Sequence, residues 1–279
     1  DWAKCPHYHK KAWIEKVAPF EGNEYTAFGT AMHSVCEKKL LKEEFDDVEY
    51  FIEQFEKSID RLDDDVEINS LLIEQMEDQG KLIIPEIEEA LNNYFGEDYE
   101  IVGSEIPLYE DIVLPWKADW SKYKFKGFID AVVMTPDGKV HLFDWKTCTW
   151  GWNAMKRSDP MVTYQLTLYK HFFAQKMDID PKNIETHFSL LKRTAKKDYV
   201  EFFRVTSGPK KTQNALKLLN KALYNIKKKS YIKIDYHANI VNLDTPSIVH
   251  KWRKKNVFSR VYLDRWQQAN CQIKKQNES

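Results

Sequence analysis

The sequence has few cysteines and no long apolar run. Of its 279 residues only four are cysteine, at positions 5, 36, 148 and 271, and none forms a Cys-x-x-Cys pair. A disulfide scaffold is therefore excluded, and thiols in a reducing compartment are the simplest interpretation. No stretch approaches the ~18–20 apolar residues of a membrane helix, and no secretion signal is recognisable. We expect a cytoplasmic protein with no membrane partner.

A large net charge is also absent, but the average hides an asymmetry. Lys and Arg number 42 against 43 Asp and Glu. Residues 37–119 carry a net charge of −19, whereas residues 189–279 carry +15. Such a basic segment suggests nucleic acid at one face, although oppositely charged helix faces packed on each other remain the alternative. Three aromatic residues in the basic third suit stacking on single-stranded DNA: Trp252, Tyr262 and Trp266.

Hydrophobic periodicity predicts a mixed α/β protein with a central mixed sheet flanked by helices. The expected helices cover residues 3–18, 28–45, two or three segments within 46–98, 161–177 and 210–230, with Gly29-Thr30 as the start signal of the second and Pro85 breaking or starting another. The expected strands cover residues 99–114, 123–135, 139–147, 184–194 and 199–206. No Gly, Pro or Ser-rich linker is evident.

We therefore expect residues 1–279 to form a single domain. Its divisions would be a helical insertion lobe at 37–98, a sheet core at 99–206 and a basic helical C-terminal region at 207–279.

A predicted hairpin in the middle of the chain carries two aspartates among apolar neighbours, where a charge is costly unless it is compensated. The turn at 136–138 has the sequence Pro-Asp-Gly, a strong turn signal. As a three-residue loop it pairs Thr135 with Lys139 and places Asp130 opposite Asp144 on one face of the sheet. A two-residue turn would send Asp144 to the other face instead.

Lys146 lies two residues beyond Asp144 and therefore points to the same face. Two carboxylates so close repel each other unless a proton or cation lies between them. Oxygen ligands at this spacing suit Mg²⁺ or Mn²⁺, and a lysine beside them can hold a water or a phosphate. The alternative is an Asp–Lys ion pair on an exposed face of the hairpin.

Four short motifs occur in the order typical of one nuclease family: "GTAMH" (29–33), "GFID" (127–130), "DWKT" (144–147) and "QLTLY" (165–169). Together they resemble the PD-(D/E)xK nuclease superfamily, in particular its RecB-type nuclease domains. The opening "CPHYHKKAW" is similar to the start of phage and CRISPR-associated exonucleases of that group. The resemblance implies a restriction-endonuclease-like core within the mixed α/β class.

The resemblance also implies roles for individual residues. The implied metal ligands are His33, Asp130, Asp144 and the backbone carbonyl of Trp145, holding one or two Mg²⁺ or Mn²⁺ ions. Lys146 is implied to be catalytic together with both aspartates. Glu105 matches an acidic position that could reach a second ion or its waters. Taken alone, His33 would more often be a packed helix residue than a ligand.

Four further residues are expected to contact DNA or to brace the site: Gln165, Tyr169, Trp150 and Trp152. For Tyr169 and the two tryptophans, packing in the core is an equally good interpretation. Many relatives bind an iron–sulfur cluster through one early and three late cysteines. Here only Cys5 and Cys271 fit those places, so we expect no such cluster.

The resulting expectation is a metal-dependent deoxyribonuclease. An exonuclease acting on single-stranded or end-containing DNA in recombination, repair or phage DNA processing fits best. It would act in a bacterial cytoplasm or, if phage-encoded, in that of the host, with a helicase or recombination protein as a further partner. Two alternatives remain open: a structure- or site-specific endonuclease, and a catalytically silent DNA-binding subunit of a helicase–nuclease complex.

Overall fold

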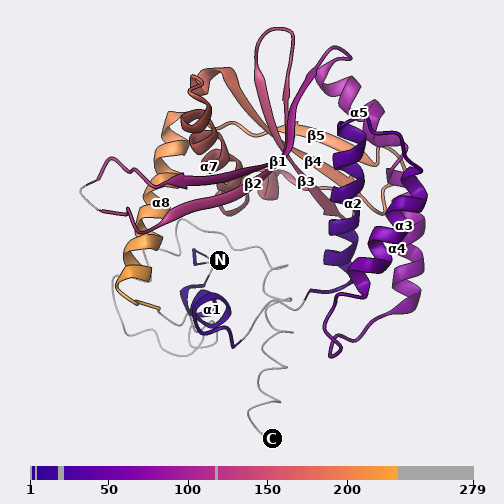
Figure 1. The fold of residues 1–279 in the computed structure, drawn as a ribbon, viewed down its shortest axis with the longest axis horizontal. Coiled ribbons are helices and arrows are strands. Elements are labelled where there is room, and N and C mark those ends of the chain that lie inside the picture. Colours follow the sequence, from indigo (N-terminus) through magenta and orange to yellow (C-terminus); the bar gives the residue numbers. More distant parts are fainter. Residues whose placement is uncertain (1, 4, 18–21, 117–118, 232–279) are drawn as a thin grey trace, which may run out of the picture. The chain divides into compact units, whose positions relative to one another are not determined.

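A central sheet of five strands organises the described part of the chain. The computed structural model describes residues 2–3, 5–17, 22–116 and 119–231. Helices lie on both sides of the sheet, which contains parallel and antiparallel strand pairs (Figure 1). The predicted fold class, mixed α/β with a central mixed sheet, is confirmed.

The helices and strands follow the predicted order with small shifts at their ends. Before the sheet lie α1 (Pro6–His9), the π-helical η1 (Lys10–Glu15), α2 (Glu24–Leu40), α3 (Asp47–Ile59), α4 (Ser70–Ile83) and α5 (Glu86–Phe95). The strands are β1 (Glu100–Asp111), β2 (Lys124–Met134), β3 (Val140–Cys148), β4 (Ile184–Lys192) and β5 (Val200–Arg204). The remaining helices are α6 (Ala154–Ser158), α7 (Pro160–Met177), the 3₁₀ turn η2 (Pro181–Asn183) and α8 (Pro209–Lys227). The sequence did not predict α6 and η2, because segments this short show no periodicity.

Helix α2 begins earlier than predicted. Asn23 is the residue before its first turn, and its side chain accepts the backbone N–H of Thr26 at 3.1 Å. The Thr26 hydroxyl in turn accepts the N–H of Asn23 at 2.8 Å, which completes a capping box. The start signal expected at Gly29-Thr30 is therefore wrong, because Gly29 lies inside the helix. Pro85 directly precedes α5, as one of the two options predicted.

The strands lie in the order β1-β2-β3-β4-β5. The first three form an antiparallel meander, β4 runs parallel to β3, and β5 is antiparallel to β4. A parallel pair needs a long crossover, and α6 and α7 supply it between β3 and β4. Helix α7 is thereby placed against the strand that carries Asp144.

The β2–β3 hairpin has the predicted three-residue loop. Thr135 donates its N–H to the carbonyl of Lys139 at 3.0 Å. The ladder then runs from the Met134–Val140 pair and ends at Ala131 opposite Phe143. Asp130 and Asp144 come next on each strand, where the ladder has ended.

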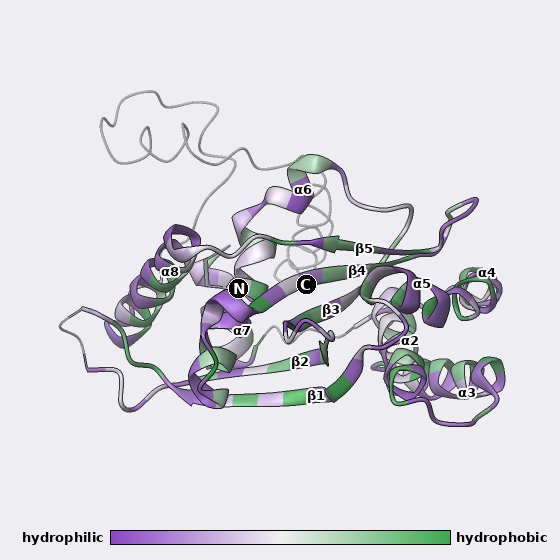
Figure 2. Ribbon diagram, turned by 90° about the horizontal axis from the view of Figure 1, so that it is seen from above, coloured by the Kyte–Doolittle hydropathy of each residue, from purple (hydrophilic) through white to green (hydrophobic). Residues whose placement is uncertain are grey.

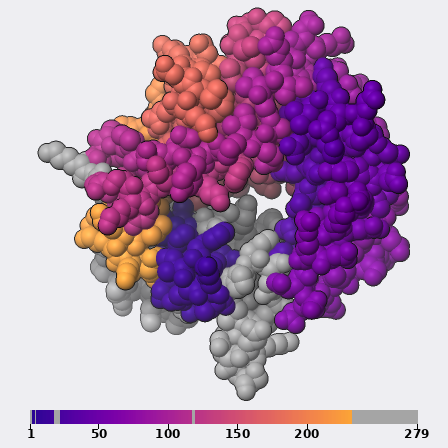
Figure 3. All heavy atoms as spheres, viewed as in Figure 1, coloured from indigo at the N-terminus to yellow at the C-terminus, as the bar shows by residue number. Residues whose placement is uncertain are grey.

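Two hydrophobic cores lie on opposite faces of the sheet. Side chains at alternate positions, such as Phe143 and Trp145, pack with α2–α5. Their strand neighbours, such as Leu142, pack with α7 and α8. The helices alternate hydrophilic and hydrophobic residues along their ribbons, as Figure 2 shows for α3 and α4. Atoms of α2–α5, coloured indigo to purple, form one continuous surface at the right of Figure 3.

Helices α3 and α4 pack closely because Gly80 leaves room for Phe51. A methyl group at Gly80 would overlap the Phe51 ring, which is fully buried against Phe28 and Phe55. Among the described helices, none has the length and apolarity needed to cross a bilayer.

We predict that Gly80→Ala destabilises the protein. Overpacking a dense core costs roughly 1–3 kcal/mol, more than the ~1 kcal/mol by which alanine exceeds glycine in helix propensity. Gly29→Ala is the matched control, since its methyl group would lie 3.5 Å from Thr147 in ordinary contact. Chemical denaturation should lower the free energy of unfolding for Gly80→Ala and leave it equal or higher for Gly29→Ala. Equal stability of the two variants would contradict the packing argument.

Candidate functional site

Polar side chains gather where β2 and β3 separate. Beyond the last ladder pair, the carboxylate of Asp130 accepts the backbone N–H of Trp145 at 2.8 Å. The Asp130 side chain thus accepts the N–H that a backbone carbonyl of β2 would accept if the ladder continued. The carboxylate is thereby held between β2 and β3, with only 12% of the side chain exposed.

Helix α2 and strand β1 bring two more potential ligands to Asp130. The Nδ1 of His33 lies 3.5 Å from Oδ2 of Asp130. His33, Glu105 and Asp130 each offer one potential ligand atom, and these three atoms lie within 4.8 Å of one another. Burial lowers the pKa of His33, although the Asp144 carboxylate and a hydrogen bond to the Trp145 backbone act in the opposite direction. The imidazole is therefore neutral at physiological pH, the form that binds a metal.

Asp144 is buried, with 1% of its side chain exposed, and both of its oxygens face polar groups. Lys146 Nζ lies 2.5 Å from Oδ2, and Gln165 Nε2 donates to Oδ1 at 2.7 Å. Burial alone would lower the pKa of Lys146, but the carboxylates of Asp144 and Asp130 outweigh it and raise this pKa. Lys146 therefore stays protonated and acts as a fixed cation rather than as a base.

The charges at this end of the sheet are poorly balanced without a further cation. Burial first, and then the Asp144 carboxylate, raise the pKa of Asp130 to about 8. The buried Oδ2 of Asp144 makes no hydrogen bond of regular geometry, despite its close ammonium neighbour. Oxygen and imidazole donors that converge in this way fit a divalent cation, which would lower the pKa of Asp130 again.

Glu105 reaches the site through an unusual backbone conformation. Its φ of 48° lies in the left-handed region, which is uncommon for a residue with a side chain. Strand β1 also changes register just before it, between Ile101 and Gly103. Partial burial, with Glu37 and Asp144 nearby, raises the pKa of Glu105. Its carboxylate groups with His33 and Asp130 rather than with the core.

Gln165 and Tyr169 lie on one face of α7 and contact each other. Gln165 Nε2 is 3.2 Å from the Tyr169 hydroxyl. Tyr169 is 9% exposed, and a methyl group at position 127 would come within 2.6 Å of its ring. Gly127 therefore permits the close approach of Tyr169, a role that the sequence alone did not reveal. Tyr169 packs in the core and at the same time holds the glutamine that contacts Asp144.

The two tryptophans after β3 differ in exposure. Trp150 is 77% exposed, whereas Trp152 is 8% exposed and packs against Phe188 at 5.0 Å between ring centroids. Packing is thus the role that the structure shows for Trp152, and Trp150 is free to contact a ligand. Three residues that were expected to stack on DNA, Trp252, Tyr262 and Trp266, lie outside the described residues, as does Cys271.

At this site a lysine and acidic side chains lie where two strands of a mixed sheet separate, and an adjacent helix adds a histidine. This arrangement is typical of nucleases. The chain belongs to the PD-(D/E)XK nuclease superfamily, whose family model matches residues 1–275. The resemblance inferred from the four motifs is confirmed. Divalent metals are the cofactors of this superfamily, and the donors described above fit one.

One solved structure supports the fold. A provisionally named exonuclease from Eubacterium rectale matches with a TM-score of 0.50 and 14% identity, covering 90% of this chain and 87% of its own. The structure of SSO0001 matches with a TM-score of 0.33 and 14% identity, covering 85% and 95%, which is too distant to bear on the fold. A search of curated proteins found no match.

The raised pKa of Asp130 predicts how the metal-free protein responds to pH. Between the ordinary aspartate value of 3.8 and about 8, the folded chain holds a proton that the unfolded chain has released. The folded state therefore binds more protons, and the free energy of unfolding falls as pH rises through this window. Asp130→Asn should remove this contribution and raise the melting temperature at pH 8 in EDTA. Asp111→Asn, at the exposed end of β1, is the control and should leave the slope unchanged; an identical slope in all three proteins would refute the prediction.

Proposed function

We propose that the protein is a Mg²⁺- or Mn²⁺-dependent deoxyribonuclease that hydrolyses phosphodiester bonds. The observation that carries this proposal is the meeting of His33 with Asp130, beside a lysine ion-paired to the buried Asp144. A structural ion pair would account for Asp144 and Lys146 alone. It would not account for a neutral imidazole and two further carboxylates converging on the same place.

The proposed ligands are His33, Asp130, Asp144 and the backbone carbonyl of Trp145, with Glu105 serving a second ion. When bound there, a divalent ion would supply Lewis-acid chemistry toward a phosphoryl oxygen and a water. Lys146, held protonated by Asp144, donates hydrogen bonds that orient the attacking water and stabilise negative charge on the phosphoryl oxygens. Gln165 holds Asp144, and Tyr169 in turn limits the movement of Gln165. Because imidazole suits softer ions, Mn²⁺ should support activity at least as well as Mg²⁺.

An exonuclease acting on single-stranded DNA or on duplex ends fits these features best. Trp150 is exposed just beyond the strand that carries Lys146, where it could stack on a base. Helices α3–α5, which pack with α2 in one core, carry many acidic side chains that would repel a passing duplex, whereas the basic C-terminal third would attract a strand. We place the activity in recombination, repair or phage DNA processing, with a helicase or recombination protein as partner.

Replacing the proposed catalytic lysine separates chemistry from binding. Lys146→Ala should lower the cleavage rate by about 10²–10³-fold, the usual effect of removing one preorganised electrostatic group. Its affinity for DNA in EDTA should change little, because binding along the backbone is spread over many cations. Lys57→Ala, which removes an exposed lysine of α3, is the control and should retain full activity. Wild-type cleavage by Lys146→Ala would exclude the assigned role.

Circular DNA distinguishes the two modes of cleavage. With Mn²⁺ or Mg²⁺, we expect degradation of linear end-labelled single strands and no cleavage of a circular single strand of the same sequence. The physical reason is that an exonuclease needs an end to enter its site. Nicking of the circle at a similar rate would identify an endonuclease instead. No cleavage of either substrate with any divalent ion would favour a silent DNA-binding subunit.

A further inference from the structure

A second group of metal-binding side chains lies away from the proposed nuclease site. His141 is near the start of β3, and Glu185 and His187 are on the parallel strand β4. His141 pairs directly with Glu185 in the ladder, and His187 lies two residues further along the same face. His141 and Asp144 point to opposite faces of β3, because their positions are three apart and side chains alternate between the two faces. The sequence did not predict this cluster.

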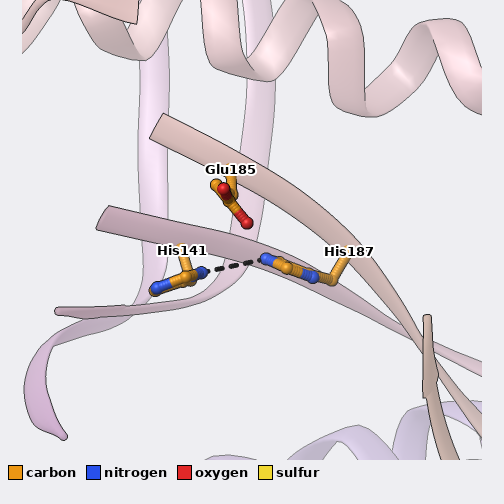
Figure 4. Close-up of side chains that lie close together, drawn as sticks. All are labelled: His141, Glu185 and His187. Carbon is orange, nitrogen blue, oxygen red and sulfur yellow. Dashed lines mark hydrogen bonds between the residues drawn. The ribbon is translucent and has the colours of Figure 1, made fainter. Parts of the chain in front are cut away.

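The two imidazoles meet nitrogen to nitrogen. Nδ1 of His141 lies 3.0 Å from Nε2 of His187, and Figure 4 shows the Glu185 carboxylate beside the gap between the rings. One ligand atom of each of the three residues lies within 4.8 Å of the others. Two imidazoles on one tetrahedral zinc ion, with Zn–N bonds of ~2.0–2.1 Å, place their nitrogens about 3.3 Å apart. The observed separation is close to that value.

The outer nitrogen of each ring has its own hydroxyl partner. The Thr135 hydroxyl lies 2.9 Å from Nε2 of His141, and the Tyr94 hydroxyl lies 3.1 Å from Nδ1 of His187. Both hydroxyl oxygens can accept the ring N–H, so both inner nitrogens can present lone pairs to the same point. Metal-binding histidines are usually oriented by such a hydrogen bond from the nitrogen that does not bind the metal. Without a metal, the same two hydroxyls satisfy the outer nitrogens of a pair joined by an N–H···N hydrogen bond, and zinc would take the place of that bond.

The surroundings keep both rings neutral and leave space for a ligand. His141 is 8% exposed and His187 is 2% exposed, and burial lowers the pKa of both, that of His187 to about 3. Phe95 packs against both rings. The cluster lines a cavity of about 410 Å³, large enough for a water as a fourth ligand. Glu185 is held by Arg204 at 2.9 Å, which orients the carboxylate but also competes with a metal for it.

We propose that His141, His187 and Glu185 form a binding site for a divalent transition metal, with zinc as the best match to two imidazoles and one carboxylate. The site is independent of the nuclease centre. Metal here would join β3 to β4, and through the Tyr94 hydrogen bond it would tie α5 to the sheet. Its main effect would therefore be on the stability of this end of the sheet. The competing occupant is an anion such as phosphate, bound by Arg204 and Lys139.

The test uses the full chain with Asp130→Asn and Asp144→Asn, which removes two of the three carboxylates of the proposed nuclease site. Equilibrium dialysis against Zn²⁺ should show one tightly bound equivalent, and zinc at 100 times its Kd should raise the melting temperature by about 5–10 °C. Adding His187→Gln should weaken binding at least about 100-fold. Tyr94→Phe should weaken it about 10–100-fold while keeping every ligand, as expected for an orienting hydrogen bond. His171→Gln, a half-buried histidine of α7, is the matched control and should bind zinc normally.

Zinc binding that is unaffected by His187→Gln would overturn the proposal, as would the absence of tight binding. Stabilisation by inorganic phosphate, lost in Arg204→Gln, without stabilisation by zinc would identify an anion site and would also overturn it. His187→Gln could fail to fold. In that case, anomalous diffraction at the zinc edge, measured on crystals of the Asp130→Asn, Asp144→Asn protein, locates the bound zinc. A peak between residues 141 and 187 supports the proposal, and a peak only elsewhere refutes it. The result is independent of the nuclease proposal, because the protein used in this test has no active nuclease centre.

Discussion

The centre is arranged around one buried negative charge, the carboxylate of Asp144. A carboxylate removed from water is strongly unfavourable unless it is paired and hydrogen-bonded. Lys146 supplies the pairing from the same strand, and Gln165 supplies the hydrogen bond from α7. These contacts require β3 and the crossover helix to be docked correctly, so the electrostatics of the site and the packing of the sheet depend on each other. The neighbouring Asp130 shares this unfavourable environment, which explains why a cation suits the place.

Much of the centre could be predicted from local sequence because strand alternation and turn length set which side chains share a face. Taken as a three-residue loop, Pro136-Asp137-Gly138 places Asp130 and Asp144 together with Lys146 beside them, whereas a two-residue turn would have separated them. The four-residue spacing of Gln165 and Tyr169 likewise placed them on one helix face. His33 is different, since nothing local joins it to a hairpin about a hundred residues later. It was found only because the order of four motifs resembled a known family.

The features that were missed depend on contacts between distant segments. The pairing of β3 with β4 has no local signal, so His141 and His187 each looked like a single histidine in an apolar strand. The cap at Asn23 was overlooked because Gly29-Thr30 is a more conspicuous start signal, although Gly29 lies inside the helix. The left-handed backbone at Glu105 and the space that Gly127 leaves for Tyr169 follow from tertiary structure. Alternation along a strand says which face a side chain occupies, but not what it meets there.

The distribution of the centre along the chain has a consequence for its biosynthesis. Its parts come from a helix near the N-terminus, from a hairpin in the middle, and from the crossover helix that ends at Met177. A ribosome releases these segments in that order, and the crossover helix must emerge before Asp144 gains its glutamine partner. A partly synthesised chain therefore holds the aspartates and the lysine without their full support. The centre therefore cannot be complete before the chain has been synthesised at least as far as Gln165.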